Sequence, residues 1–315
     1  MILYDRVSWI SMVLRVHGSV VSRVFPRVLA TTAVSIVFTY LQRYEVFHHS
    51  LTLAPFLITG LPLGIILGFR NTSSYDRFWE GRKLWGQLVN TSRSFTRQLD
   101  TFVVARDPED AETFTAFRRA TLYRLIAFSA ALCKHLRRER DFEEIGPLFD
   151  ATESMQAITK LSEEASPPSA ILHRLGGDIR LAQEKGWLES RQASMLDVSL
   201  TSLTDVLGGC ERIKNTPTPI SYLIFIHRAV AIYCLLLSFG VADTVHTLTP
   251  LVVFFVSYAL FSMDAIGDEL DDPFKSSQNT LPIAFIARNI EIEVRRRLGE
   301  KDLPKPLAPK DGVLT

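Results

Sequence analysis

The residue types that most often carry chemistry are thinly spread along this chain. Its seven histidines include one adjacent pair, His48 and His49, and none has the HExxH spacing of a zinc-binding helix. Neighbouring side chains on a regular element point in different directions, so we interpret this pair as loop residues rather than metal ligands. The three cysteines are far apart and form no CxxC motif, which indicates neither a disulfide framework nor a zinc site. We therefore predict that the protein is not an enzyme and has no metal cofactor.

The spacing that does suggest a function lies in an uncharged stretch at residues 51–69, LTLAPFLITGLPLGIILGF. These 19 residues are about enough to cross a bilayer as a helix, since ~20 apolar residues span the ~30 Å hydrocarbon core. The stretch ends abruptly at Arg70. We predict a transmembrane helix here.

Two stripes recur at every fourth position of this helix, and residues four apart share a helix face. The glycine stripe consists of Gly60, Gly64 and Gly68, and the bulky stripe consists of Leu61, Ile65 and Phe69. Small residues let a second helix backbone approach closely in a membrane. If several copies of the helix surround an axis, the bulky stripe would face the opening. The alternative is a lipid-facing or core helix with scattered glycines.

Bulk composition indicates a protein that lies partly in a membrane and partly in water. The 315 residues are 47% hydrophobic, with a mean hydropathy of +0.14 and a net charge of +1. This hydropathy is high for a soluble protein and low for a chain that lies entirely in a bilayer. A nucleic-acid-binding protein would carry a basic surplus, so that class is excluded.

Three further segments complete a predicted set of four transmembrane helices. Residues 28–42 and 247–263 are uncharged runs of 15 and 17 residues, and residues 221–243 are apolar apart from His227-Arg228 near their start and a terminal aspartate. The intervening sequence keeps helical periodicity, with no alternating strand pattern. We therefore predict an all-α polytopic membrane protein with a large cytosolic helical domain.

The distribution of Lys and Arg predicts the orientation. The connector 43–50 has one Arg and the connector 242–247 has no Lys or Arg, whereas the opposite ends of the spans are basic. Since basic residues favour the cytoplasmic side, both termini and the central domain should be cytoplasmic. The predicted parts are an N-terminal amphipathic segment (1–27), the first two spans (28–69), the cytosolic helical domain (70–217), the last two spans (218–266), a cytosolic C-terminal segment and helix (267–298) and a disordered tail (299–315).

Three motifs make the chain resemble a bestrophin of the bacterial branch. They are GLPLGIILGFRNTSSYDRFWEGRKLWG at 60–86, LGGCERIKNTPTPISY at 207–222 and DELDDPF at 268–274. The resemblance covers roughly residues 1–298. It implies a ring-shaped homopentamer in the bacterial inner (plasma) membrane, with one axial pore for inorganic ions.

The resemblance also implies roles for particular residues. Leu61, Ile65 and Phe69 fall on the positions that line the narrow hydrophobic neck of the pore. The segment GGDIRLAQ places Ile179 at a second constriction, the cytosolic aperture. The glycine stripe then becomes the face on which neighbouring spans approach each other.

Calcium dependence is not expected, although eukaryotic relatives carry a calcium clasp after the fourth span. Glu269 and Asp272 occupy the start of that region, but the acidic run that should follow is replaced by KSSQNT at 275–280. Calcium takes six to eight oxygen ligands, many of them carboxylates. We predict a degenerate clasp and calcium-independent behaviour.

The permeant ion stays open at this point, because the family includes anion channels, typically for chloride, and bacterial members that favour small cations such as sodium. Arg70 just past the neck would draw anions if it faced the axis, or it would form a packing ion pair. Two other classes are a secondary transporter, which would favour inverted repeats, and a non-conducting membrane adaptor.

Overall fold

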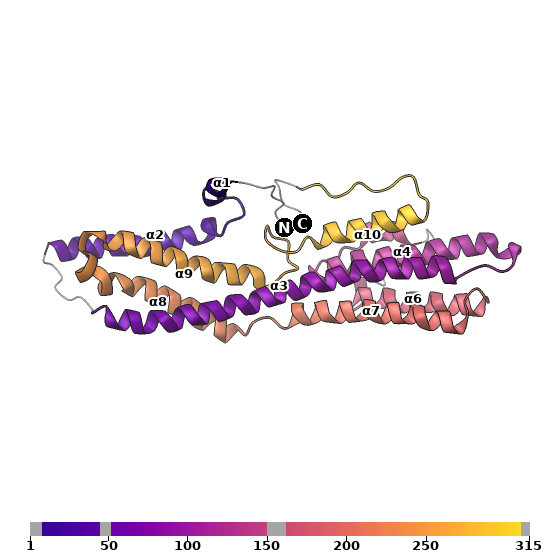
Figure 1. Cartoon of the computed structure of the whole chain (residues 1–315), viewed down its shortest axis with the longest axis horizontal. Helices are drawn as coiled ribbons and strands as arrows, with labels where there is room; N and C mark the ends of the chain where they lie inside the picture. The colour runs from indigo at the N-terminus through magenta and orange to yellow at the C-terminus, as the bar shows by residue number, and fades with distance from the viewer. Residues whose placement is uncertain (1–7, 45–51, 150–161, 310–315) are drawn as a thin grey trace. The chain divides into compact units, whose positions relative to one another are not determined.

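A computed structural model describes residues 8–44, 52–149 and 162–309, and every regular element in these ranges is a helix. In chain order the helices are α1 (Trp9–Val13), α2 (Val21–Arg43), α3 (Ala54–Phe102), η1 (Pro108–Asp110), α4 (Ala111–Leu136), η2 (Glu143–Leu148), α6 (Pro167–Glu184), α7 (Ser190–Asn215), α8 (Ile220–Val245), η3 (His246–Leu248), α9 (Thr249–Asp271) and α10 (Ile283–Arg297), where η marks a short 3₁₀ helix (Figure 1). The all-α class predicted from the sequence is confirmed for these ranges. The pair His48 and His49 lies outside them.

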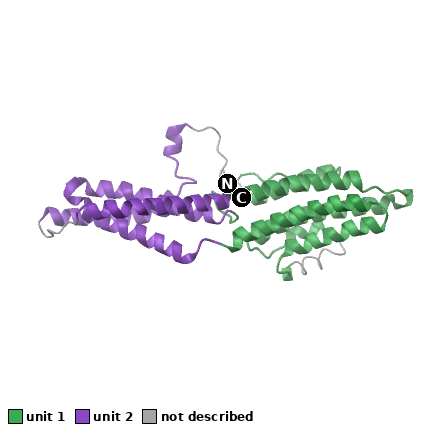
Figure 2. Cartoon of the chain, turned by 60° about the horizontal axis from the view of Figure 1, so that its bottom comes forward, with its two compact units in different colours: residues 1–3, 79–216, 274–315 green, residues 4–78, 217–273 purple. Residues whose placement is uncertain are grey.

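The chain forms two compact units (Figure 2). Unit 1 comprises residues 1–3, 79–216 and 274–315, and unit 2 comprises residues 4–78 and 217–273. The long helix α3 contributes to both, because its 49 residues continue without a break from the predicted second span into the polar sequence beyond it. The division therefore falls at Phe78 on α3, nine residues after the uncharged stretch ends at Phe69.

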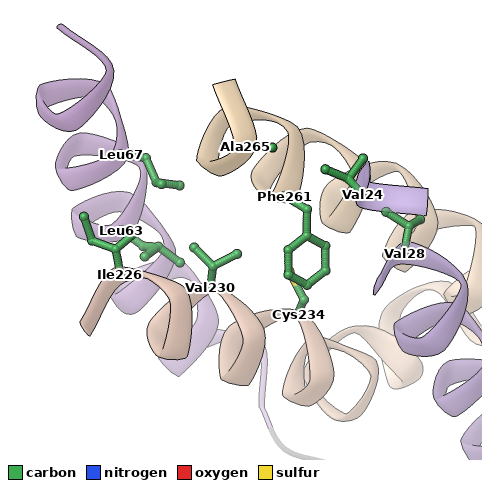
Figure 3. Packing of buried hydrophobic residues seen from close by; sticks show 9 residues of the cluster. All are labelled: Val24, Val28, Leu63, Leu67, Ile226, Val230, Cys234, Phe261 and Ala265. Carbon is green, nitrogen blue, oxygen red and sulfur yellow. The ribbon is translucent and has the colours of Figure 1, made fainter. Parts of the chain in front are cut away.

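Unit 2 is a bundle of α2, the first part of α3, α8 and α9. Figure 3 shows its main core, to which every one of the four helices contributes. The core residues are Val24 and Val28 of α2, Leu63 and Leu67 of α3, Ile226, Val230 and Cys234 of α8, and Phe261 and Ala265 of α9. Van der Waals packing of this kind holds helices together where no water is present to drive burial.

Three helical stretches among the described residues are long and apolar enough to cross a membrane, namely Val21–Arg43, Ala54–Phe102 and Ile220–Asp271. The third stretch contains both α8 and α9, because His246 adopts a φ of 48° that breaks the helix. Since α8 and α9 also pack against each other, the short connector reverses the direction of the chain. The four helices of unit 2 thus stand where the sequence predicts four spans, although α2 already begins at Val21 and includes Arg27.

Before α2, the five-residue helix α1 exposes its large apolar side chains, including Trp9 at 80% and Ile10 at 65%. An exposed apolar face next to arginines is compatible with the amphipathic segment predicted at 1–27.

Unit 1 packs the second part of α3 with α4, α6, α7 and α10. Its largest fully buried side chains include Trp85 and Phe95 of α3 and Phe128 of α4. At Gly209 of α7, an added Cβ would lie 2.9 Å from the methyl groups of Leu84 on α3. This glycine therefore allows α7 to pass close to α3.

Candidate functional site

The bulky stripe of α3 is exposed within the single chain. Leu61, Ile65 and Phe69 expose 70%, 50% and 70% of their surfaces. By contrast, Leu63 and Leu67 on the same helix expose 6% and 0% and belong to the core of unit 2. Helix α3 thus turns one apolar face into its own bundle and a second face away from it. We call Leu61, Ile65 and Phe69 the neck stripe; a face of this kind needs lipid, another chain or a narrow pore to cover it.

The three glycines of the stripe beside the neck stripe have different neighbours within the chain. An added Cβ at Gly60 would lie 2.5 Å from the hydroxyl oxygen of Tyr233, so Gly60 packs against α8 of its own chain. An added Cβ at Gly64 or Gly68 would meet nothing within 4 Å. Only Gly64 and Gly68 therefore leave space for a helix from another chain.

A charge cluster lies directly after the neck stripe and joins all four helices of unit 2. It consists of Arg27 of α2, Arg70 of α3, His227 of α8, and Asp264 and Asp268 of α9. The Nη1 and Nη2 atoms of Arg70 donate to Oδ1 of Asp264 and Oδ1 of Asp268, respectively. His227 Nδ1 lies 2.7 Å from Asp264 Oδ2, and its Nε2 lies 3.8 Å from Asp268 Oδ1. Arg27 Nη1 lies 3.9 Å from Asp264 Oδ2.

Arg70 is 2% exposed, so its guanidinium does not lie at an open surface of the chain. Of the two interpretations left by the sequence, a pore-exit charge and a packing ion pair, the structure places Arg70 in the ion pair. Removing one partner from a buried ion pair typically costs about 3–5 kcal/mol, because the other charge is left uncompensated. Arg70 therefore holds the turn of α3 that follows Phe69 against α9.

Gly267 makes room for this contact on α9. An added Cβ at Gly267 would lie 2.6 Å from Asn71 Oδ1 and 3.3 Å from Arg70 Nε. A side chain at this position would displace the side chains of Asn71 and Arg70 and so disturb the contact of α3 with α9 at the charge cluster.

His227, Asp264 and Asp268 are also ligand types for a metal, and one atom from each lies within 4.8 Å of the others. Both carboxylates are already paired with the buried guanidinium of Arg70. A metal cation would have to displace that guanidinium or bear its repulsion. We therefore interpret the cluster as an ion-pair network rather than a metal centre.

The acidic end of α9 is held by hydrogen bonds from other segments of unit 2 to Asp271. Glu269 and Asp272 are half-buried, and Asp272 is the C-terminal cap of α9. Asp271 between them accepts a hydrogen bond of 2.6 Å from the Thr218 hydroxyl, and Arg77 Nε donates to its backbone oxygen at 2.9 Å. This region therefore has a structural role within unit 2, whatever it binds.

Ile179 lies on α6 in unit 1 and exposes 7% of its surface. Its neighbour Asp178 accepts two hydrogen bonds from Arg124 Nη1 of α4, at 2.7 Å and 2.9 Å. This pair fixes the α6 backbone next to Ile179. Only an edge of the Ile179 side chain is available to a pore, whereas the neck stripe is largely open.

The charge cluster was missed by the sequence analysis, although one signal could have found it. Arg27, Arg70 and His227 each lie at or near one end of an apolar run, and Asp264 directly follows the fourth run. Antiparallel spans bring these ends to one level of the bundle. Their pairing nevertheless depends on how each helix is rotated, which the spacing does not specify.

Apolar helices with an exposed apolar stripe are typical of a membrane protein, and comparison with known proteins identifies the family. The family model of the bacterial and fungal bestrophin proteins matches residues 1–296. The chain therefore belongs to the bestrophin family, as its three motifs indicated.

Curated relatives match over nearly the whole chain. The voltage-dependent anion channel-forming protein YneE of Salmonella typhi is 35% identical over 310 residues, which cover 98% of both chains. The voltage-dependent anion channel-forming protein RSc3414 of Ralstonia nicotianae is 33% identical over 320 residues and covers all of both. The crystal structure of a bacterial bestrophin homologue from Klebsiella pneumoniae matches with a TM-score of 0.79 at 31% identity, covering 90% of this chain and 100% of that one.

Proposed function

We propose that this chain forms a homopentameric anion channel in which ions pass passively through one axial pore. The observation that carries the proposal is the exposed neck stripe on α3, in a chain of the bestrophin family. Five copies of α3 around an axis would cover the stripe and at the same time line a pore with it. The role is conduction rather than catalysis.

The neck stripe is the proposed gate. The eight helical steps from Leu61 to Phe69 would line about 12 Å of pore wall, at ~1.5 Å per step. An apolar ring does not bind ions, but its width decides whether water and ions pass, because a narrow hydrophobic constriction loses its water. Gly64 and Gly68 would let neighbouring copies of α3 come close enough to form the ring. Ile179 would add a second constriction through the edge of its side chain.

Chloride and other anions are the proposed permeant ions, because the relatives are named as anion channel-forming proteins. Arg70 does not supply the selectivity, since two aspartates pair with it inside the bundle. A channel that prefers small cations is the alternative, because the neck stripe itself carries no charge.

The proposed channel lies in the bacterial inner membrane, with α2, α3, α8 and α9 as its four spans and both termini in the cytoplasm. Calcium is not proposed as a ligand. Beyond Glu269 and Asp272, the sequence KSSQNT at 275–280 offers no carboxylate to complete a clasp.

The test is a reversal potential measured on the purified protein in a planar bilayer across a KCl gradient. An ideally anion-selective pore reverses at the chloride potential, about 59 mV for each tenfold ratio of concentrations. Reversal at the potassium potential would show that the channel selects cations and would refute the proposed anion selectivity. Saturable flux without unitary currents would indicate a transporter, and the lack of any ion flux in liposomes would indicate an adaptor.

A further inference from the structure

We propose that the charge cluster is a proton-responsive clamp on the neck, in which Arg70 positions the turn that carries Phe69 and His227 senses the proton. This inference rests on the proposed channel function, because it assigns a regulatory input to the same neck. It concerns five side chains that meet within one bundle and join all four of its helices.

Arg70 is the link between the cluster and the pore wall. It follows Phe69 directly, so the two side chains leave α3 about 100° apart on the same turn. Phe69 is 70% exposed, whereas Arg70 is 2% exposed and donates from both Nη atoms to carboxylates of α9. Any change in the hold of α9 on Arg70 therefore moves the turn that carries Phe69.

The ring of His227 makes this hold sensitive to protons. Its Nδ1 faces Asp264 Oδ2 at 2.7 Å and its Nε2 faces Asp268 Oδ1 at 3.8 Å. A neutral imidazole carries one N–H, so in either tautomer the lone pair of its other nitrogen faces a carboxylate. Only the imidazolium directs an N–H at both aspartates. Protonation therefore strengthens the cluster as it stands in the structure.

The weak hold of the half-exposed Arg27 on Asp264 leaves room for a second cation there, which favours the same direction. His227 faces two carboxylates of α9, those of Asp264 and Asp268. The same carboxylates also pair with Arg70 of α3, and Asp264 pairs with Arg27 of α2. Arg228, the neighbour of His227 on α8, is exposed. With a neutral ring, two arginines balance two aspartates. Arg27 is the weaker of the two cations, because it is half-exposed and 3.9 Å from Asp264 Oδ2. The protonated ring of His227 would pair with Asp264 Oδ2 at 2.7 Å, which is closer than Arg27.

The clamp predicts how current depends on pH. When the contacts within the cluster are strong, Arg70 holds the turn that carries Phe69 against the bundle of its own chain. A loose cluster lets Phe69 move away from the bundle, toward the other copies around the axis, which narrows the neck. Histidine changes charge between about pH 5 and pH 8. Wild-type current at fixed voltage should therefore fall several-fold as the pH rises through this range.

The test compares wild type with His227→Gln in planar bilayers at a series of pH values. Glutamine can still donate one hydrogen bond to Asp264 but does not titrate, so the current should become nearly independent of pH. The matched control is His173→Gln, because His173 is exposed on α6 in unit 1 and should leave the wild-type profile unchanged. Asp268→Asn is the second variant, which keeps the Arg70–Asp264 pair but removes the carboxylate that faces Nε2. It should also flatten the profile.

The outcomes separate the clamp from the channel itself. If wild type conducts but its profile survives in His227→Gln or in Asp268→Asn, the clamp is refuted and the channel stands. A wild-type current that is flat or rises with pH also refutes the clamp. If only the thermal stability of the purified protein follows the pH in a His227-dependent manner, the cluster is purely structural. The lack of any wild-type current refutes both proposals.

Discussion

Truncating the neck stripe should raise conduction, and each of its three substitutions should cost the folded chain less than the loss of a fully buried leucine. The variant replaces Leu61, Ile65 and Phe69 together with alanine. Because these side chains are removed from the proposed constriction, the neck should widen, hold water more readily and pass ions at a higher unitary conductance. The same helix supplies a control for Leu61 in Leu67→Ala, which removes an identical side chain from the buried core of unit 2.

The expected stability costs follow from the exposed fractions. Leu67 is 0% exposed in the core of unit 2, and such Leu→Ala substitutions cost about 2–5 kcal/mol. Leu61 is 70% exposed, so it loses only about a third of the contacts of a buried leucine, which corresponds to roughly 0.6–1.5 kcal/mol. Each neck-stripe substitution should therefore destabilise the protomer less than Leu67→Ala does. Leu67→Ala should lower the thermal stability without raising the unitary conductance.

The assay combines single-channel recording in symmetric KCl with size-exclusion chromatography after heating. An intact triple variant with wild-type unitary conductance would refute the neck assignment. So would an equal rise in conductance in Leu67→Ala, because the effect would then come from general loosening of the bundle.

Three further outcomes are expected. Gly64→Leu should disturb assembly or widen the neck while leaving the protomer folded. A normal pentamer with normal conductance in this variant would contradict the role of Gly64 between neighbouring copies. Gly60→Ala should instead strain the protomer itself, against Tyr233. Burial raises the pKa of Cys133 to about 11 and that of Cys210 to about 12, above their ordinary value of 9.0. As the pH rises above about 9, the unfolded chain loses these thiol protons before the folded chain does. The free energy of unfolding should therefore fall as the pH rises from about 9 toward 11. Melting curves of a double Cys→Ala variant should show a smaller fall over the same range. Finally, chelating calcium should leave the currents unchanged, and a reversible loss of current would instead indicate a functional clasp.

Much of the helical architecture is predictable from local sequence. The uncharged runs predict where apolar helices lie, since a backbone in a bilayer must satisfy its own hydrogen bonds. The four-residue spacing of Leu61, Ile65 and Phe69 predicts a shared face, because any α-helix imposes that geometry. Both expectations depend only on residues close together in the chain.

The partners across helices are not predictable in this way. Arg70 and Asp264 are separated by 194 residues, and their pairing depends on how α3 and α9 are rotated about their own axes. The same rotation places Gly60 against Tyr233 while it leaves Gly64 open. The burial of Ile179 depends in the same way on how α6 packs within unit 1, which the spacing alone does not predict.

The sequence by itself therefore determined the family, the helical class and the apolar stripe that the proposed neck needs. Only the tertiary structure decided that the charge beside this stripe is held inside the bundle, between two aspartates and next to a histidine. The physical reason is that helix periodicity is a property of each segment alone, whereas a buried charge is stable only where packing brings opposite charges to it.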